Sequence, residues 1–176
     1  MVHAPMRDGA REINKPVRIL YMEDDSVLAG LIRKRLQRQL YQVDVAEDGG
    51  QGLSMYQAAS YDLLLLDHYM PVFTGMEVLQ TLQARGPLPP VIVLTGRGDA
   101  TLAVEAMKLG ASDYMVKDPE GKFVDLLPMA IERALAHYRL RQEEMCSLDG
   151  LRTREELLRL ISDTLPLCIS YMNTEH

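Results

Sequence analysis

The stretch VRILYMEDD, residues 17–25, decides the fold, because an apolar, β-branched run there stops abruptly at three acidic residues. A short apolar run of this kind is typical of a strand that is buried on both faces of a sheet. Similar runs recur along the chain, and they predict five strands: Val17–Met22, Tyr41–Val45, Tyr61–Asp67, Val91–Thr95 and Ser112–Val116.

Amphipathic segments separate these strands, with apolar residues every three or four positions as in a helix. The predicted helices are Ser26–Gln39, Gly49–Ala59, Met76–Ala84, Ala100–Leu109 and a fifth that begins near Gly121. The inward faces of the first and fourth are predicted to hold Leu28, Leu31, Ile32 and Leu36, and Leu102, Val104, Ala106 and Met107. Five strand–helix units favour a doubly wound α/β fold, a flavodoxin-like (βα)5 parallel sheet in the order 2-1-3-4-5 with an extended C-terminal helix.

Composition narrows the class of protein. The 176 residues suit one domain plus extensions, and the net charge of -6 argues against a nucleic-acid partner, which would need a basic face. Neither a membrane-spanning run nor an apolar signal core is visible, so a cytoplasmic location is expected. Cys146 and Cys168 form no metal-ligand or disulfide pattern.

Chemically active side chains follow the predicted strands. Residues 23–25 (EDD) follow the first strand, Asp67 and Thr95 end the third and fourth, and Lys117 follows the fifth. The carboxyl ends of parallel strands meet at one edge of a sheet, so these groups are expected to converge. Clustered carboxylates favour a hard cation such as Mg²⁺, a carboxylate can attack phosphorus, and ammonium and hydroxyl groups can bind phosphoryl oxygens. Taken singly, each residue also has an ordinary structural role, and Asp25 or Ser26 is expected to cap the first helix.

Five pieces of the chain, in this order and spacing, resemble the receiver domain of two-component response regulators over about residues 17–139. The pieces are ILYMEDD (19–25), DHYMP (67–71) with Gly75 following, VIVLTG (91–96), GASDY (110–114) and VK (116–117). The resemblance implies a phosphoprotein of phosphorelay signal transduction that accepts a phosphoryl group from a histidine kinase or phosphotransfer protein. Such a domain is a phosphoacceptor with self-catalysed phosphorylation and dephosphorylation rather than an enzyme, and it controls an attached output domain.

The resemblance also assigns roles to residues. Asp67 corresponds to the aspartate that becomes the aspartyl phosphate. Thr95 and Lys117 correspond to the pair that contacts the phosphoryl group, and Tyr114 to the aromatic switch that follows the threonine. The Mg²⁺ ligands are implied to be Glu23, Asp24, Asp67 and the backbone carbonyl of Tyr69.

Four positions depart from the family pattern. Glu23 stands where aspartate is commoner, His68 where an aliphatic residue is usual, and bulky Tyr69 borders the expected phosphoryl site. Asp118 follows Lys117 where the family usually has proline, which leaves open whether this peptide bond is cis or trans.

The predicted organisation has four parts. Residues 1–16 form an extension, 17–140 the receiver domain and 141–150 a helical linker, and 151–176 weakly resemble the start of a PAS domain. In the last part, Asp149-Gly150 predicts a break, Thr153–Thr164 a helix and Cys168–Met172 a strand. The C-terminal helices are predicted to form a homodimer, because their apolar face needs cover.

Three other functions fit the sequence less well. A haloacid-dehalogenase-like Mg²⁺-dependent phosphatase would want a second acid two residues after its nucleophile, where Tyr69 stands. A nucleotide-binding module would need a glycine-rich loop after the first strand, where EDD stands instead. A phosphorylation-independent interaction module is disfavoured because the complete set of acids, threonine and lysine is present.

Overall fold

A computed structural model of the chain describes residues 15–96, 98 and 100–172, with side chains as far as residue 147. Strands and helices alternate along it. They are β1 (Arg18–Met22), α1 (Ser26–Gln37), β2 (Gln42–Ala46), α2 (Gly49–Ala58), β3 (Leu63–Asp67), α3 (Gly75–Gln83), β4 (Val91–Thr95), α4 (Ala100–Lys108), β5 (Asp113–Val116) and α5 (Lys122–Met172).

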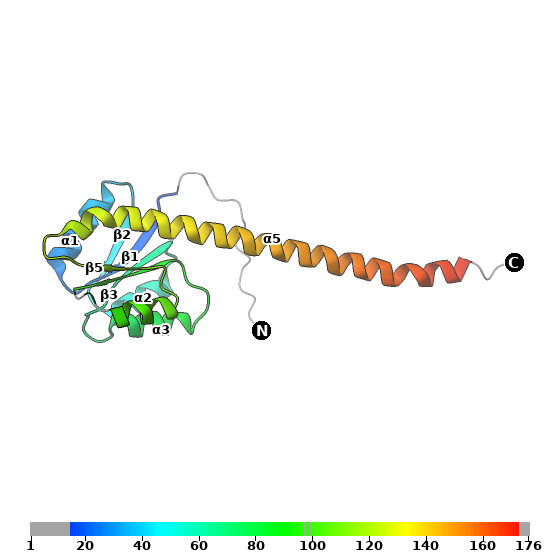
Figure 1. The fold of residues 1–176 in the computed structure, drawn as a ribbon, viewed down its shortest axis with the longest axis horizontal. Coiled ribbons are helices and arrows are strands. Elements are labelled where there is room, and N and C mark those ends of the chain that lie inside the picture. Colours follow the sequence, from blue (N-terminus) through cyan, green and yellow to red (C-terminus); the bar gives the residue numbers. More distant parts are fainter. Residues whose placement is uncertain (1–14, 97, 99, 173–176) are drawn as a thin grey trace. The chain divides into compact units, whose positions relative to one another are not determined.

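All five strands pair in parallel, in the order β2-β1-β3-β4-β5, and helices cover both faces of the sheet (Figure 1). The predicted flavodoxin-like fold is therefore confirmed. Strand bounds agree with the predicted ones to within two residues, and those of β4 are identical.

Alternation along the strands divides the core in two, since neighbouring side chains of a strand point to opposite faces. Leu63 and Leu65 of β3 pack with α1 and the first turns of α5. Leu64 and Leu66 pack on the other face with α2, α3 and α4. Every residue of β3 is buried, which explains why four leucines follow one another before its final Asp67.

Two helix faces were predicted in part wrongly. Leu31 of α1 and Val104 and Met107 of α4 are half-exposed rather than inward. The buried residues of α1 are Ala29, Ile32 and Leu36, and that of α4 is Ala106. Successive helix residues lie about 100° apart around the axis, so Leu31 and Met107 face outward when their neighbours Ile32 and Ala106 face the core.

The C-terminal segment also differs from expectation, because α5 continues through the predicted break at Asp149-Gly150 and the predicted strand Cys168–Met172. One glycine costs a helix about 1 kcal/mol, which the good helix formers around it (LRTREELLRL, 151–160) outweigh. A lone strand has no partner for its backbone groups, whereas a helix satisfies its own. The chain divides into two units after Leu135, and the predicted domain limits remain predictions.

None of the described helices combines the length and the apolarity that a membrane-spanning helix needs.

Candidate functional site

The predicted site residues meet at the carboxyl-terminal edge of the sheet. Glu23 and Asp24 follow β1, Asp67 ends β3, Thr95 ends β4 and Lys117 follows β5. Because β1 and β3 are neighbours at the centre of the sheet, the acids of one strand face the acid of the other. The sequence argument for convergence at this edge is therefore confirmed for the acids and the lysine.

Three carboxylates form the centre of the site. Glu23, Asp24 and Asp67 each offer an oxygen, and these oxygens lie within 4.8 Å of one another. Glu23 and Asp67 are buried, while Asp24 is exposed at the mouth of the cluster. Like charges this close repel one another, so the arrangement favours a bound cation or a bridging positive group.

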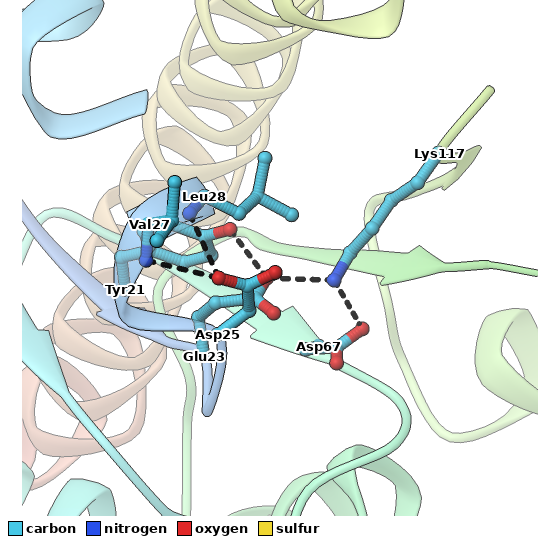
Figure 2. Close-up of polar contacts among 7 residues, drawn as sticks. All are labelled: Tyr21, Glu23, Asp25, Val27, Leu28, Asp67 and Lys117. Atoms are coloured by element: carbon cyan, nitrogen blue, oxygen red, sulfur yellow. Dashed lines mark hydrogen bonds and ion pairs between the residues drawn. The ribbon is translucent and has the colours of Figure 1, made fainter. Parts of the chain in front are cut away.

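Lys117 is that positive group within the chain. Its Nζ donates to Glu23 Oε2 at 2.6 Å and lies 2.8 Å from Asp67 Oδ1 (Figure 2). The second contact is an ion pair rather than a well-directed hydrogen bond, because Asp67 Oδ1 is buried without a hydrogen-bond partner among the described residues. The lysine side chain is only 13% exposed, so water screens these contacts weakly.

Electrostatics at the buried acids are unfavourable in spite of the lysine. Burial raises the pKa of Glu23, and the hydrogen bonds from Lys117 and Tyr21 only partly offset the increase. Burial likewise raises the pKa of Asp67, opposed by Lys117 and reinforced by the charge of Asp24. One ammonium faces three carboxylates, so negative charge is left uncompensated.

These residues fit Mg²⁺, the cation that the sequence predicts. Hard divalent cations take carboxylate oxygens, and the three acids supply them at one point. Asp67 Oδ1, buried without a hydrogen bond, is an oxygen with unused acceptor capacity.

Sequence reasoning missed Tyr21, which belongs to the site. Its hydroxyl donates to Glu23 Oε2 at 2.5 Å, so that this oxygen accepts from both Tyr21 and Lys117 (Figure 2). Burial and the neighbouring Glu23 raise the pKa of the tyrosine strongly, which keeps the hydroxyl protonated as a donor. The signal was present in the sequence, because residues two apart in a strand share a face.

The third acid after β1, Asp25, has a structural role. Its Oδ1 accepts hydrogen bonds from the backbone N–H groups of Val27 at 2.9 Å and Leu28 at 3.1 Å, as Figure 2 shows. Asp25 is thus the N-cap of α1, as predicted.

Thr95 and Tyr114 lie on neighbouring strands. Thr95 is fully buried, and its carbonyl accepts from the N–H of Lys117 at 2.7 Å. Tyr114 pairs in register with Val93, two residues before Thr95, so both side chains belong to the same face of the sheet. Tyr114 is partly buried and packs against the core on the side of α2, α3 and α4.

The loop after β3 brings its backbone close to Asp67. A Cβ at Gly75 would lie 2.3 Å from the carbonyl oxygen of Asp67, so only glycine fits there.

Tyr69 is half-exposed, and its ring meets that of His68 edge-to-face with the centroids 4.4 Å apart. Burial lowers the pKa of His68, against the raising effect of the Glu105 charge.

Asp118, which replaces the usual proline, has a specific role. Its carboxylate accepts from the backbone N–H groups of Lys122 at 2.9 Å and Phe123 at 2.7 Å, at the start of α5. Burial acts to raise the pKa of Asp118, but these hydrogen bonds outweigh it and the pKa is lowered. The described residues contain no cis peptide bond, so the bond between Lys117 and Asp118 is trans.

Comparison with known proteins agrees with this geometry. The family model of the response regulator receiver domain matches residues 19–127. The transcriptional regulatory protein DltR of Streptococcus agalactiae is 32% identical over 148 residues, and the match covers 84% of this chain and 62% of that protein. Response regulator ArlR of Staphylococcus saprophyticus is 31% identical over 155 residues, covering 85% of this chain and 66% of that protein.

Solved structures of receiver domains match the chain as well. A response regulator receiver domain protein from Clostridium thermocellum is 31% identical with a TM-score of 0.64, covering 70% of this chain and 98% of its own. The chemotaxis response regulator CheY4 of Vibrio cholerae is 26% identical with a TM-score of 0.61, covering 68% of this chain and 99% of its own. The match spans less than two thirds of the length of DltR.

Proposed function

This chain belongs to the family of response regulator receiver domains of two-component systems, and from that premise we propose that it is a Mg²⁺-dependent phosphoacceptor whose acceptor is Asp67. The observation that carries the proposal is the contact of Lys117 Nζ with Asp67 Oδ1, 2.8 Å apart within a cluster of three carboxylates. The lysine holds one oxygen of the carboxylate and provides positive charge beside the reacting centre.

The proposed reaction is a phosphoryl transfer to a carboxylate. An oxygen of Asp67 forms a bond to phosphorus while the bond from phosphorus to the donor breaks, and the donor's leaving atom keeps the electron pair. With a histidine kinase or phosphotransfer protein as donor, that atom is an imidazole nitrogen, which then recovers a proton from solvent. On this proposal the domain supplies the nucleophile and the charge and takes up one phosphoryl group per molecule, so it acts as an acceptor rather than as an enzyme.

Glu23, Asp24 and Asp67 would hold the metal, together with the carbonyl of Tyr69. When bound, Mg²⁺ supplies positive charge that offsets the negative charge of the phosphoryl oxygens and of the acceptor. Lys117 is placed to follow the new negative charge, because its ammonium already contacts two of the acids and is not tied to any one of them. A phosphoryl group on Asp67 would compete with Glu23 for this ammonium.

Thr95 and Tyr114 would convert the chemistry into a change of surface. Thr95 ends β4, the strand next to β3, where Asp67 pairs with Leu94, and its side chain shares a sheet face with Tyr114 on β5. A hydroxyl drawn toward the phosphoryl group leaves room that the aromatic ring of Tyr114 can enter. Such a shift requires contacts that differ between the two states, and the threonine hydroxyl supplies one.

The test is intact mass after incubation with a small-molecule phosphodonor such as acetyl phosphate. A gain of one phosphoryl group is expected only with Mg²⁺, and Asp67→Asn should abolish it. Asp44→Asn is the matched control, because Asp44 is also a sheet aspartate in an ion pair, with Arg18 at 2.9 Å, away from the cluster. Equal mass gain in Asp67→Asn and wild type would refute Asp67 as acceptor.

Assembly forms a second part of the proposal. The continuation of α5 beyond Leu135 is proposed to pair with its counterpart in a second chain, giving a homodimer. Sedimentation of the full chain and of one ending at Arg141 measures this directly. A full-length monomer, or a truncated chain that stays dimeric, would exclude the helix as the dimer surface.

A further inference from the structure

Glu23 is held in place by a buried tyrosine on its own strand. Tyr21 is 0% exposed, and its hydroxyl donates to Glu23 Oε2 at 2.5 Å. The N–H of Glu23 donates to the carbonyl of Ala46 at 2.9 Å, which continues the pairing of β1 with β2 by one residue. The backbone is therefore still extended at Glu23, and the two side chains lie on one face of the strand.

The two oxygens of Glu23 are consequently not equivalent. Oε2 accepts from Tyr21 and from Lys117, the latter at 2.6 Å, so both hydrogen bonds fall on the same oxygen of Glu23. The two donors lie on different elements, Tyr21 in β1 and Lys117 in the loop after β5. Together they hold the carboxylate in place. The carboxylate that these donors hold is one of the three whose oxygens lie within 4.8 Å of one another, the others being those of Asp24 and Asp67.

We propose that Tyr21 is a positioning residue of the metal site. Its hydroxyl holds the carboxylate of Glu23 in place, which makes this glutamate an effective metal ligand. The proposal rests on the proposed function, since it concerns the same cation. A flexible glutamate would lose rotamer freedom each time a cation binds, whereas one already held by a hydroxyl has lost it on folding. The contact with Tyr21 thus explains how glutamate, rather than the shorter aspartate, can serve as the acid at position 23.

Side-chain length makes the idea testable. Aspartate is shorter than glutamate by one carbon–carbon bond, about 1.5 Å. Its carboxylate would then lie about 4 Å from the Tyr21 hydroxyl, beyond hydrogen-bond range. The effect of removing the hydroxyl should therefore be large beside Glu23 and nearly absent beside an aspartate.

The experiment is a double-mutant cycle on Mg²⁺ affinity, measured without a phosphodonor by titration of backbone amide shifts. Tyr21→Phe is expected to weaken Mg²⁺ binding about 10-fold in the wild-type background, the order expected for a hydrogen bond to a charged group. In the Glu23→Asp background the same change should alter affinity less than about twofold. Tyr61→Phe is the matched control, because Tyr61 is another buried tyrosine, away from the site, whose pKa is raised by burial and by the nearby carboxylate of Asp44.

A second readout is independent of the metal. A buried hydroxyl bonded to a carboxylate should give a slowly exchanging, downfield proton resonance, which disappears in Tyr21→Phe and also in Glu23→Asp. This measurement stands even if Tyr21→Phe does not fold, because it needs only the wild type and the glutamate variant. A resonance unaffected by Glu23→Asp would refute the contact.

The outcomes separate the two proposals. A wild-type chain without Mg²⁺ affinity would refute the metal site itself and Tyr21's role with it. If the wild type binds but Tyr21→Phe binds equally well or more tightly, only the positioning role is refuted. Equal loss of affinity in both backgrounds would likewise refute it, since the loss would then come from general destabilisation.

Discussion

Replacing the proposed acceptor by asparagine should make the fold more stable. Asp67→Asn removes one of three carboxylates whose oxygens lie within 4.8 Å of one another. At an effective dielectric constant of about 20, each of its two repulsions amounts to at least about 3.5 kcal/mol, and the attraction to Lys117 at 2.8 Å to about 6 kcal/mol. Attraction and repulsion nearly cancel, and water screens the repulsion from the exposed Asp24 further. The free energy of burying the Asp67 charge therefore decides whether the substitution stabilises or destabilises the fold.

Burial of an ion is unfavourable, so the neutral amide should stabilise the chain by about 1–2 kcal/mol at pH 7 without Mg²⁺. Urea unfolding followed by circular dichroism would show this as a midpoint higher by about 0.5–1 M. The control Asp44→Asn loses an ion pair with Arg18 and relieves no repulsion, so its midpoint should fall or stay unchanged. Saturating Mg²⁺ should close the gap, because it binds the wild type and not the variant.

The pH dependence follows from the raised pKa of Asp67. A carboxyl whose pKa is higher in the folded than in the unfolded state destabilises the fold once ionised, and the penalty fades as it takes up a proton. The advantage of Asp67→Asn should therefore shrink as the pH falls from 7 through the raised pKa toward the ordinary aspartate value of about 3.9. A variant less stable than wild type at pH 7, or an advantage independent of pH, would refute the reasoning.

Two further substitutions test the switch and the loop. Thr95→Ala should still be phosphorylated but leave the ring resonances of Tyr114 unchanged on phosphorylation; a shift equal to that of wild type would exclude the coupling. Gly75→Ala should reduce phosphorylation at least about 10-fold, because the new Cβ would lie 2.3 Å from the Asp67 carbonyl oxygen and must displace it. Gly30→Ala is its control, since a Cβ there meets nothing within 4 Å and should add about 0.5–1 kcal/mol of helix stability; wild-type phosphorylation in Gly75→Ala would show that the close approach is not needed.

Convergence of the site could be predicted from the sequence because it depends on topology alone. Once five apolar runs are placed in parallel, any residue that follows a strand belongs to one edge of the sheet. Asp24, Asp67 and Lys117 needed no knowledge of side-chain packing to be brought together. The same argument gave the strand order, since right-handed crossovers leave few ways to connect alternating strands and helices.

The inward faces of the helices were harder to predict. Apolar periodicity identifies the apolar side of a helix but not which of its residues lie at the centre of that side. In α1, Leu31 and Ile32 are adjacent in the predicted stripe, yet only Ile32 is buried. Ile32 is buried together with Ala29 and Leu36, so these three residues define the side of α1 that faces the core. That choice is made by packing between elements, which a single segment does not encode.

Tyr21 and Asp118 escaped prediction for opposite reasons. Tyr21 lies within an apolar strand, where its aromatic ring is enough to explain its burial. The sequence therefore gives no separate indication that its hydroxyl has a role. Asp118 was noticed only as a missing proline, whereas its carboxylate accepts two backbone N–H groups at the start of α5. Both side chains adjoin a site residue, Glu23 in one case and Lys117 in the other, and both replace conformational freedom by a hydrogen bond. The residues that take part in the chemistry can therefore be read from their type and place, while those that hold them are visible only when donors and acceptors are matched in space.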